Sequence, residues 1–170
     1  MREATVSAIR AAGLDPEYVD RLVRATVAED LDGGVDVTSV ATVPADQRST
    51  MDLVTRAAGV VAGIPVAAAV FDIVSNGDAE TAVVTSDGAE VERGAVLLTV
   101  TGRTRDLLTA ERTALNLLCH LSGVATATAR WVRALEGTGA RVRDTRKTTP
   151  GLRVLEKYAV RCGGGVNHRM

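Results

Sequence analysis

The chain has 170 residues, with 20 basic and 21 acidic side chains and a formal net charge of −1. This length suits one domain, or a small domain with part of another, and a content of 46% hydrophobic and 24% charged residues excludes wholesale disorder. No apolar run approaches the roughly 20 residues that cross a bilayer, and the N-terminus shows no signal-peptide pattern. Two cysteines do not make a disulfide framework. We therefore expect a soluble, cytoplasmic protein that binds no membrane.

The charge is distributed unevenly along the chain. Residues 1–92 carry 16 acidic and 6 basic side chains, whereas residues 93–170 carry 5 acidic and 14 basic ones. Such a basic segment favours an anionic partner. Binding of single-stranded nucleic acid would need aromatic platforms within the basic groove. The aromatic residues are few and scattered, so we expect no nucleic acid and favour a small polyanion as the partner.

The first hundred residues predict a mixed domain of helices and strands. A helix begins at Asp15-Pro16, an N-cap followed by proline, runs to about residue 31 and stops at Gly33-Gly34. Residues 36–44 predict an irregular stretch. Residues 51–61 alternate between apolar and polar side chains, as strands do. A short apolar helix follows over residues 65–74. Two further strands are expected at 81–85 and 96–101, with a turn at Asp87-Gly88 between them.

The hairpin around residues 87–94 is similar to that of a biotinyl or lipoyl carrier. A carrier presents its modified lysine at an exposed hairpin tip, and this chain has no lysine before Lys147. The carrier interpretation is therefore excluded, and the hairpin is expected to be purely structural.

The pattern changes in the second part of the chain. Residues 107–135 predict a helix that is broken near Ser122-Gly123, followed by a short strand at 140–143, a helix at 152–161 and a strand at 166–168. We therefore predict an α+β domain over residues 1–106 and, over 107–170, the start of an α/β barrel or a doubly wound sheet. A complete barrel needs roughly 250 residues, so only its first units are expected.

The loop at residues 144–151, DTRKTTPG, follows a predicted strand, where α/β proteins place their sites. Arg146 can bind a carboxylate or phosphate with two parallel N–H bonds, and Lys147 adds a compact charge beside it. The alternative is a solvated loop with ordinary surface charges. His168 and Arg169 end the next predicted strand, so all four cations are expected to converge on one rim.

Two features near this rim remain open. His168 is also compatible with a hydrogen-bonded histidine that has no functional role. The glycines at 163–165 act either as a flexible helix stop or as a place where backbone amides approach an anion. The sequence contains no Cys/His metal spacing, no nucleophile elbow and no Walker-type loop. No metal-ligating residue is predicted.

Several blocks together resemble the quinolinate phosphoribosyltransferase family, whose members are nicotinate-nucleotide pyrophosphorylases (carboxylating). These blocks are LTAERTALN at 108–116, HLSGVAT at 120–126, DTRKTTPG at 144–151 and the stretch 157–169, and the segments 29–31, 36–39 and 58–63 also fit the family's N-terminal domain. They occur in the family's order and cover nearly the whole chain. The resemblance implies the type II phosphoribosyltransferase fold, in which an α+β N-terminal domain precedes an α/β barrel.

The resemblance also implies a reaction. Quinolinate and phosphoribosyl pyrophosphate give nicotinate mononucleotide, pyrophosphate and CO₂ in NAD biosynthesis, with Mg²⁺ on the pyrophosphate. By this resemblance Arg146, His168 and Arg169 bind quinolinate, and Lys147, the expected catalytic residue, lies close to both substrates. Arg112 reaches quinolinate from the neighbouring subunit of a homodimer or larger homo-oligomer.

The family pattern continues past residue 170, through further barrel strands that carry acidic, lysine and glycine-rich elements. We therefore expect a truncated chain that is inactive alone, with the protein ligands of Mg²⁺ downstream of residue 170. One alternative is a non-catalytic module for dimerisation or ligand binding. Another is a sibling phosphoribosyltransferase for a different aromatic acid, which two cation pairs disfavour because a monocarboxylate needs fewer cations.

Overall fold

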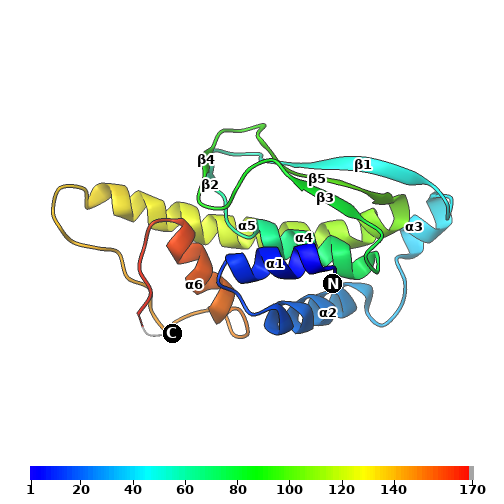
Figure 1. Ribbon diagram of the computed structural model, residues 1–170, viewed down its shortest axis with the longest axis horizontal. Helices are drawn as coiled ribbons and strands as arrows, with labels where there is room; N and C mark the ends of the chain where they lie inside the picture. Colours follow the sequence, from blue (N-terminus) through cyan, green and yellow to red (C-terminus); the bar gives the residue numbers. More distant parts are fainter. Residues whose placement is uncertain (169–170) are drawn as a thin grey trace.

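A computed structural model of the chain describes residues 1–168. A three-stranded antiparallel sheet with the order β1-β5-β3 lies on one side of a long helix, and a second sheet pairs β2 with β4 (Figure 1). The helices are α1 Glu3–Ala11, α2 Pro16–Leu31, α3 Val37–Thr42, α4 Ile64–Val74, α5 Thr104–Ala134 and α6 Arg153–Cys162. The strands are β1 Arg48–Val54, β2 Gly59–Val60, β3 Glu80–Val83, β4 Glu90–Val91 and β5 Val96–Arg103.

The core lies where α4 packs between the other helices and the sheet. Every residue of α4 from Val66 to Ile73 is buried, as its almost wholly apolar sequence requires. The N-terminus of this helix is capped from a distance, because the Asp87 carboxylate accepts hydrogen bonds from the amides of Gly63 at 2.9 Å and Ile64 at 3.0 Å. The turn predicted at Asp87 thus fastens the hairpin onto the core. No helix over the described residues 1–168 is long and apolar enough to cross a membrane.

The strands predicted at 81–85 and 96–101 are confirmed by β3 and β5, three predicted helices also match, and two predictions differ. The helices at 15–31, 65–74 and 152–161 are confirmed by α2, α4 and α6. The prediction of an irregular stretch from residue 36 is wrong, because Val37–Thr42 forms the helix α3. Its N-cap Asp36 accepts from the Ser39 amide at 3.1 Å, and Arg105 donates to the carbonyls of Val43 and Val40 at its other end.

The break predicted at Ser122-Gly123 is also wrong, because α5 is continuous for 31 residues. The hydroxyl of Ser122 accepts a hydrogen bond from the Ala62 amide at 3.1 Å, and that of Thr126, one turn later, accepts from the Val60 amide at 2.9 Å. These polar side chains join the helix to the segment around β2. Polar residues at this point therefore mark the face of α5 that packs against the β2 segment, and the helix continues through them without a break.

Gly123 is exposed within α5, and a methyl group added there would meet no atom within 4 Å. Glycine in a helix interior costs about 0.5–1 kcal/mol relative to alanine. Gly123→Ala is therefore expected to raise the free energy of unfolding by about that amount in chemical denaturation. A loss of stability would show that the backbone at this position is not an ordinary helical one.

Candidate functional site

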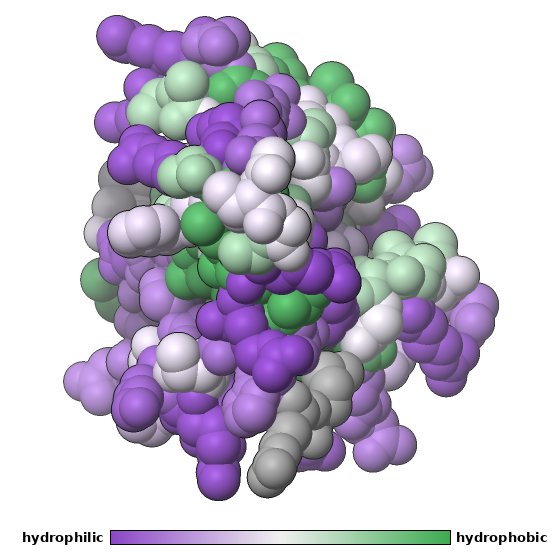
Figure 2. Space-filling view, turned by 90° about the vertical axis from the view of Figure 1, so that its left-hand side faces the viewer, coloured by the Kyte–Doolittle hydropathy of each residue, from purple (hydrophilic) through white to green (hydrophobic). Residues whose placement is uncertain are grey.

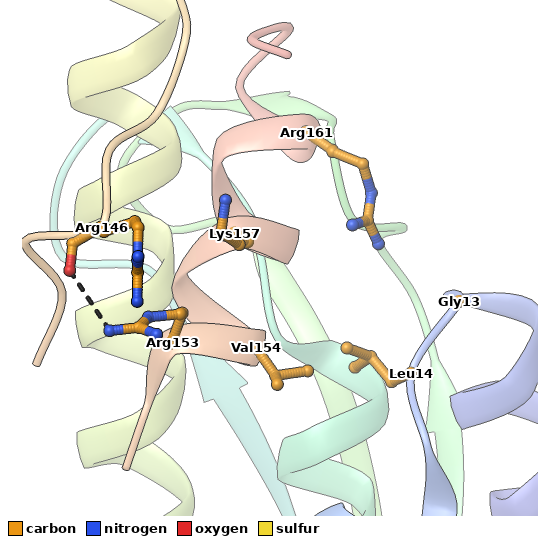
Figure 3. A pocket seen from close by; sticks show the side chains of 7 residues that line it. All are labelled: Gly13, Leu14, Arg146, Arg153, Val154, Lys157 and Arg161. Carbon is orange, nitrogen blue, oxygen red and sulfur yellow. Dashed lines mark hydrogen bonds between the residues drawn. The ribbon is translucent and has the colours of Figure 1, made fainter. Parts of the chain in front are cut away.

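A pocket of about 390 Å³ lies between α6, the loop before it and the turn that joins α1 to α2. Figure 3 shows how basic side chains from α6 and from the preceding loop surround this space. Arg153, Lys157 and Arg161 follow one another at four-residue intervals, so they share one face of the helix. The full lining is Gly13, Leu14, Arg146, Arg153, Val154, Lys157 and Arg161. The surface at this end of the molecule is mainly hydrophilic, with apolar residues showing in places (Figure 2).

Within residues 1–168, the arginines of the pocket form no ion pair. Among residues 1–168, no carboxylate lies within 4.0 Å of the guanidinium nitrogens of Arg146, Arg153 or Arg161. Their recorded partners are neutral: Arg153 donates to the carbonyl of Arg146 at 3.3 Å (Figure 3), and Arg161 donates to the carbonyl of Ala12 at 3.2 Å. Three such groups around one cavity favour the binding of an anion.

Lys157 differs from these arginines, because it is 5% exposed and fully paired. Its ammonium group donates to both carboxylate oxygens of Asp144 and to the carbonyl of His168, each at 2.9 Å. Burial raises the pKa of Asp144, but the hydrogen bonds from Lys157, the His168 amide and Asn167 outweigh it and hold that pKa below its ordinary value. The Asp144 carboxylate is therefore ionised at neutral pH, and it balances the ammonium of Lys157 so that the pair adds no net charge to the pocket.

The lowered pKa of Asp144 predicts how stability depends on pH. A carboxyl group with a lower pKa in the folded state stabilises the fold above its unfolded pKa of about 3.9, and this contribution is lost as pH falls through the folded pKa. A variant with both Lys157→Met and Asp144→Asn lacks the charged pair. It is therefore expected to lose less stability than the parent when the pH is lowered from 5 to 3. Parallel losses in urea titrations would show that other carboxyl groups dominate.

The same network joins the ends of two neighbouring chain segments. A parallel bridge pairs Arg143 with Val166, so the strands predicted at 140–143 and 166–168 lie side by side but are reduced to one bridge. Beyond it, the Asp144 side chain accepts from the His168 amide at 2.6 Å and from the Asn167 amide group at 2.7 Å. The expected proximity of the loop with Arg146 to the end of the next strand is thus present in the structure.

The residues predicted for the site fall in different places. Arg146 lines the pocket, whereas Lys147 is exposed and does not line it, and His168 is half-buried beside Asp144. Arg169 lies outside the described residues. The side chain of Arg112 is 74% exposed on α5, 3.4 Å from Asp30, and does not line the pocket either.

The glycines at 163–165 act as a helix stop, because α6 ends at Cys162 and Gly164 has a positive φ of 82°. Their amides donate to carbonyls in the last turns of α6, those of Ala159, Arg161 and Val160, so they are not free for an anion. A methyl group on Gly163 would collide with the backbone of α5 at Ala125, and one on Gly165 would meet Val160. These glycines therefore allow the end of α6 to pack closely against neighbouring backbone and side chains.

Sequence reasoning missed Arg153 and Arg161 as parts of the site. The signal is present in the sequence, because basic residues at positions 153, 157 and 161 recur at the helical interval of four. The spacing of these bases does not reveal that one of them, Lys157, is neutralised from a different segment of the chain.

The described residues do not fit the Mg²⁺ ion that the resemblance implies. Among residues 1–168 there is no group of three acidic, histidine or cysteine side chains close enough to hold a metal ion. The carboxylate within the basic loop, that of Asp144, is already occupied by Lys157, Asn167 and the His168 amide. Mg²⁺ prefers carboxylates, phosphates and water as its ligands.

Comparisons with known proteins agree with this architecture. Nicotinate-nucleotide pyrophosphorylase (carboxylating) of Mycobacterium leprae is 54% identical over 149 residues, which are 87% of this chain and 52% of that protein. A probable enzyme of the same name from Bacillus subtilis is 40% identical over 141 residues, 83% of this chain and 48% of that protein. The crystal structure of NadC from Streptococcus pyogenes matches with a TM-score of 0.87 at 40% identity, over 92% of this chain and 55% of the other.

The chain spans about half the length of the curated relatives it matches. The sequence model of the quinolinate phosphoribosyl transferase N-terminal domain matches residues 36–122, and that of the C-terminal domain of the same enzyme matches residues 124–170. The structural match supports the predicted type II phosphoribosyltransferase architecture, with its mixed α/β N-terminal part followed by the start of the barrel domain. Because two consecutive domains of one enzyme match in order, the chain belongs to the quinolinate phosphoribosyltransferase family.

Proposed function

We propose that the protein binds quinolinate at the pocket beside Arg146 and takes part in phosphoribosyl transfer from phosphoribosyl pyrophosphate. The observation that carries this proposal is the set of three guanidinium groups, free of carboxylate partners among the described residues, around one cavity. A pyridine dicarboxylate loses hydration when it binds, and its two neighbouring carboxylates repel each other. Several fixed cations offset both costs.

The products of the proposed reaction are nicotinate mononucleotide, pyrophosphate and CO₂. Departure of pyrophosphate leaves an oxocarbenium-like ribose, so positioning and electrostatic stabilisation supply most of the catalysis. Arg146, His168 and Arg169 are proposed to bind quinolinate, and Lys147 to lie near both substrates. Mg²⁺ is proposed to accompany phosphoribosyl pyrophosphate, with protein ligands outside the described residues.

The test of this function is quinolinate-dependent release of pyrophosphate from phosphoribosyl pyrophosphate, together with detection of nicotinate mononucleotide. Nicotinate in place of quinolinate is the control, because it lacks one carboxylate. The proposal predicts product only with quinolinate in the protein that carries this sequence. Equal turnover of the two acids would favour a sibling enzyme for another aromatic acid.

A site shared between subunits is proposed for Arg112. In one chain this side chain is exposed and lies outside the lining of the pocket that contains Arg146, which suits a contribution to a neighbouring copy. In a full-length protein that carries this sequence and the rest of the barrel, Arg112→Ala and Arg146→Ala subunits, each inactive alone, are expected to regain about a quarter of the sites when mixed, given random pairing and two-fold symmetry. Activity or binding stoichiometry measures the recovery. Verified mixed dimers that regain nothing would contradict a shared site.

A further inference from the structure

Lys157 occupies an unusual position among the basic residues of the pocket. Its side chain and that of Asp144 are each 6% exposed, so both charges are almost fully removed from water. A buried ion pair is stable only when its hydrogen-bonding capacity is filled. The three N–H groups of the ammonium have three acceptors, the two oxygens of Asp144 and the carbonyl of His168. Lys157 thus has no N–H left to offer an anion.

The hydrogen-bond partners of Lys157 lie in the two chain segments that carry the residues proposed to bind quinolinate. Asp144 precedes Arg146 by two residues, and the carbonyl of His168 lies at the end of the neighbouring segment. Asn167 adds a second connection, because its amide group donates both to Asp144 at 2.7 Å and to the carbonyl of Lys157 at 2.9 Å. The Lys157 ammonium therefore fastens both segments to α6.

The charge of Lys157 has a second consequence. Without it, the Asp144 carboxylate would be a buried negative charge close to a pocket that Arg146, Arg153 and Arg161 make positive. Such a charge would repel a bound anion through a medium that screens poorly. Compensation by Lys157 removes this repulsion and leaves the charge of the arginines available.

We propose that Lys157 supports the anion site by charge compensation, because it neutralises the buried Asp144 carboxylate beside the pocket without touching the ligand. This inference rests on the proposed function for the identity of the ligand, quinolinate. The geometry that carries it is the threefold hydrogen bonding of the Lys157 ammonium between Asp144 and His168.

The experiment compares the parent chain with Lys157→Met and with the double variant Lys157→Met and Asp144→Asn, beside one control variant. Isothermal titration with quinolinate, and separately with inorganic phosphate, measures the dissociation constants. Lys157→Met is expected to weaken binding by about tenfold or more, because it exposes the anion to the charge of Asp144. The double variant removes that charge too and is expected to regain most of the loss. Arg21→Met, an exposed change of the same charge on α2, is the matched control and is expected to bind as the parent does.

The recovery separates charge compensation from a purely structural role, because the double variant lacks both the ammonium and the hydrogen bonds that it donates. If Lys157 only supported the fold, the double variant would bind no better than Lys157→Met, and this result would overturn the proposal. Unchanged binding by Lys157→Met would overturn it as well. If Lys157→Met shows no cooperative unfolding, it is not properly folded, and the double variant alone is compared with the parent. Binding within about threefold of the parent supports the proposal. A loss of affinity of more than tenfold contradicts it.

Two ligands keep this test distinct from that of the proposed function. A parent chain that binds phosphate but not quinolinate contradicts the proposed function, while the three-way comparison on phosphate still tests Lys157. A parent chain that binds neither ligand has no anion site for Lys157 to organise, and this overturns the proposal.

Discussion

Replacing Arg146 with alanine is expected to weaken quinolinate binding by about ten- to a hundred-fold and to leave the stability of the fold nearly unchanged. A hydrogen-bonded charge contact contributes roughly 1.5–3 kcal/mol to binding. The side chain is exposed at the pocket and has no carboxylate partner among residues 1–168. Its removal therefore leaves no buried charge without a partner. Isothermal titration gives the affinity, and thermal unfolding gives the stability.

Arg141→Ala is the matched control for this variant. Arg141 is exposed in the same segment after α5 but does not line the pocket. It is expected to change affinity only slightly, since a distant surface charge is screened by salt. Equal effects of the two substitutions would show that the basic segment attracts anions by its net charge alone, without a specific contact at Arg146.

Gly163→Ala is expected to lower the free energy of unfolding by about 3 kcal/mol. The added methyl group would lie against the carbonyl of Ala125 in α5 and 2.7 Å from Cβ of Thr128. Neither neighbour can rotate away, because one is backbone and the other is the branch point of a buried side chain. The junction of α5 and α6 would have to open. Chemical denaturation monitored by circular dichroism measures the change.

The matched control for Gly163→Ala is Gly123→Ala, which adds the same methyl group where nothing lies within 4 Å. The two substitutions are expected to have opposite signs. A neutral Gly163→Ala variant would mean that α6 packs less closely against α5 than the structure indicates.

The fold could be predicted where local signals and burial agree. Helix α2 carries its own start signal, Asp15 with Pro16, and α4 is apolar throughout. Helix α3 could not be found in this way, because its six residues are mostly β-branched and it is held at its C-terminal end by Arg105, which is distant in the sequence. Helix α1 has no side-chain cap to mark its start, and no helix was predicted there.

The site could be predicted in part. The position of Arg146 at a pocket, and the meeting of its loop with the segment that ends at His168, followed from the order of strands and loops. The burial and pairing of Lys157 could not be predicted from the sequence, because its hydrogen-bond acceptors come from two separate segments. The presence of three adjacent glycines likewise does not reveal that their amides are used within the helix end.

The central claim is that this pocket binds a dicarboxylate through its arginines, and parallel isothermal titrations of the chain with quinolinate and nicotinate test it most directly. The second carboxylate is expected to add a charge-assisted contact of roughly 1.5–3 kcal/mol, so quinolinate should bind saturably and at least about tenfold more tightly than nicotinate. Equal affinities for the two acids, or no saturable binding of quinolinate, would contradict the account.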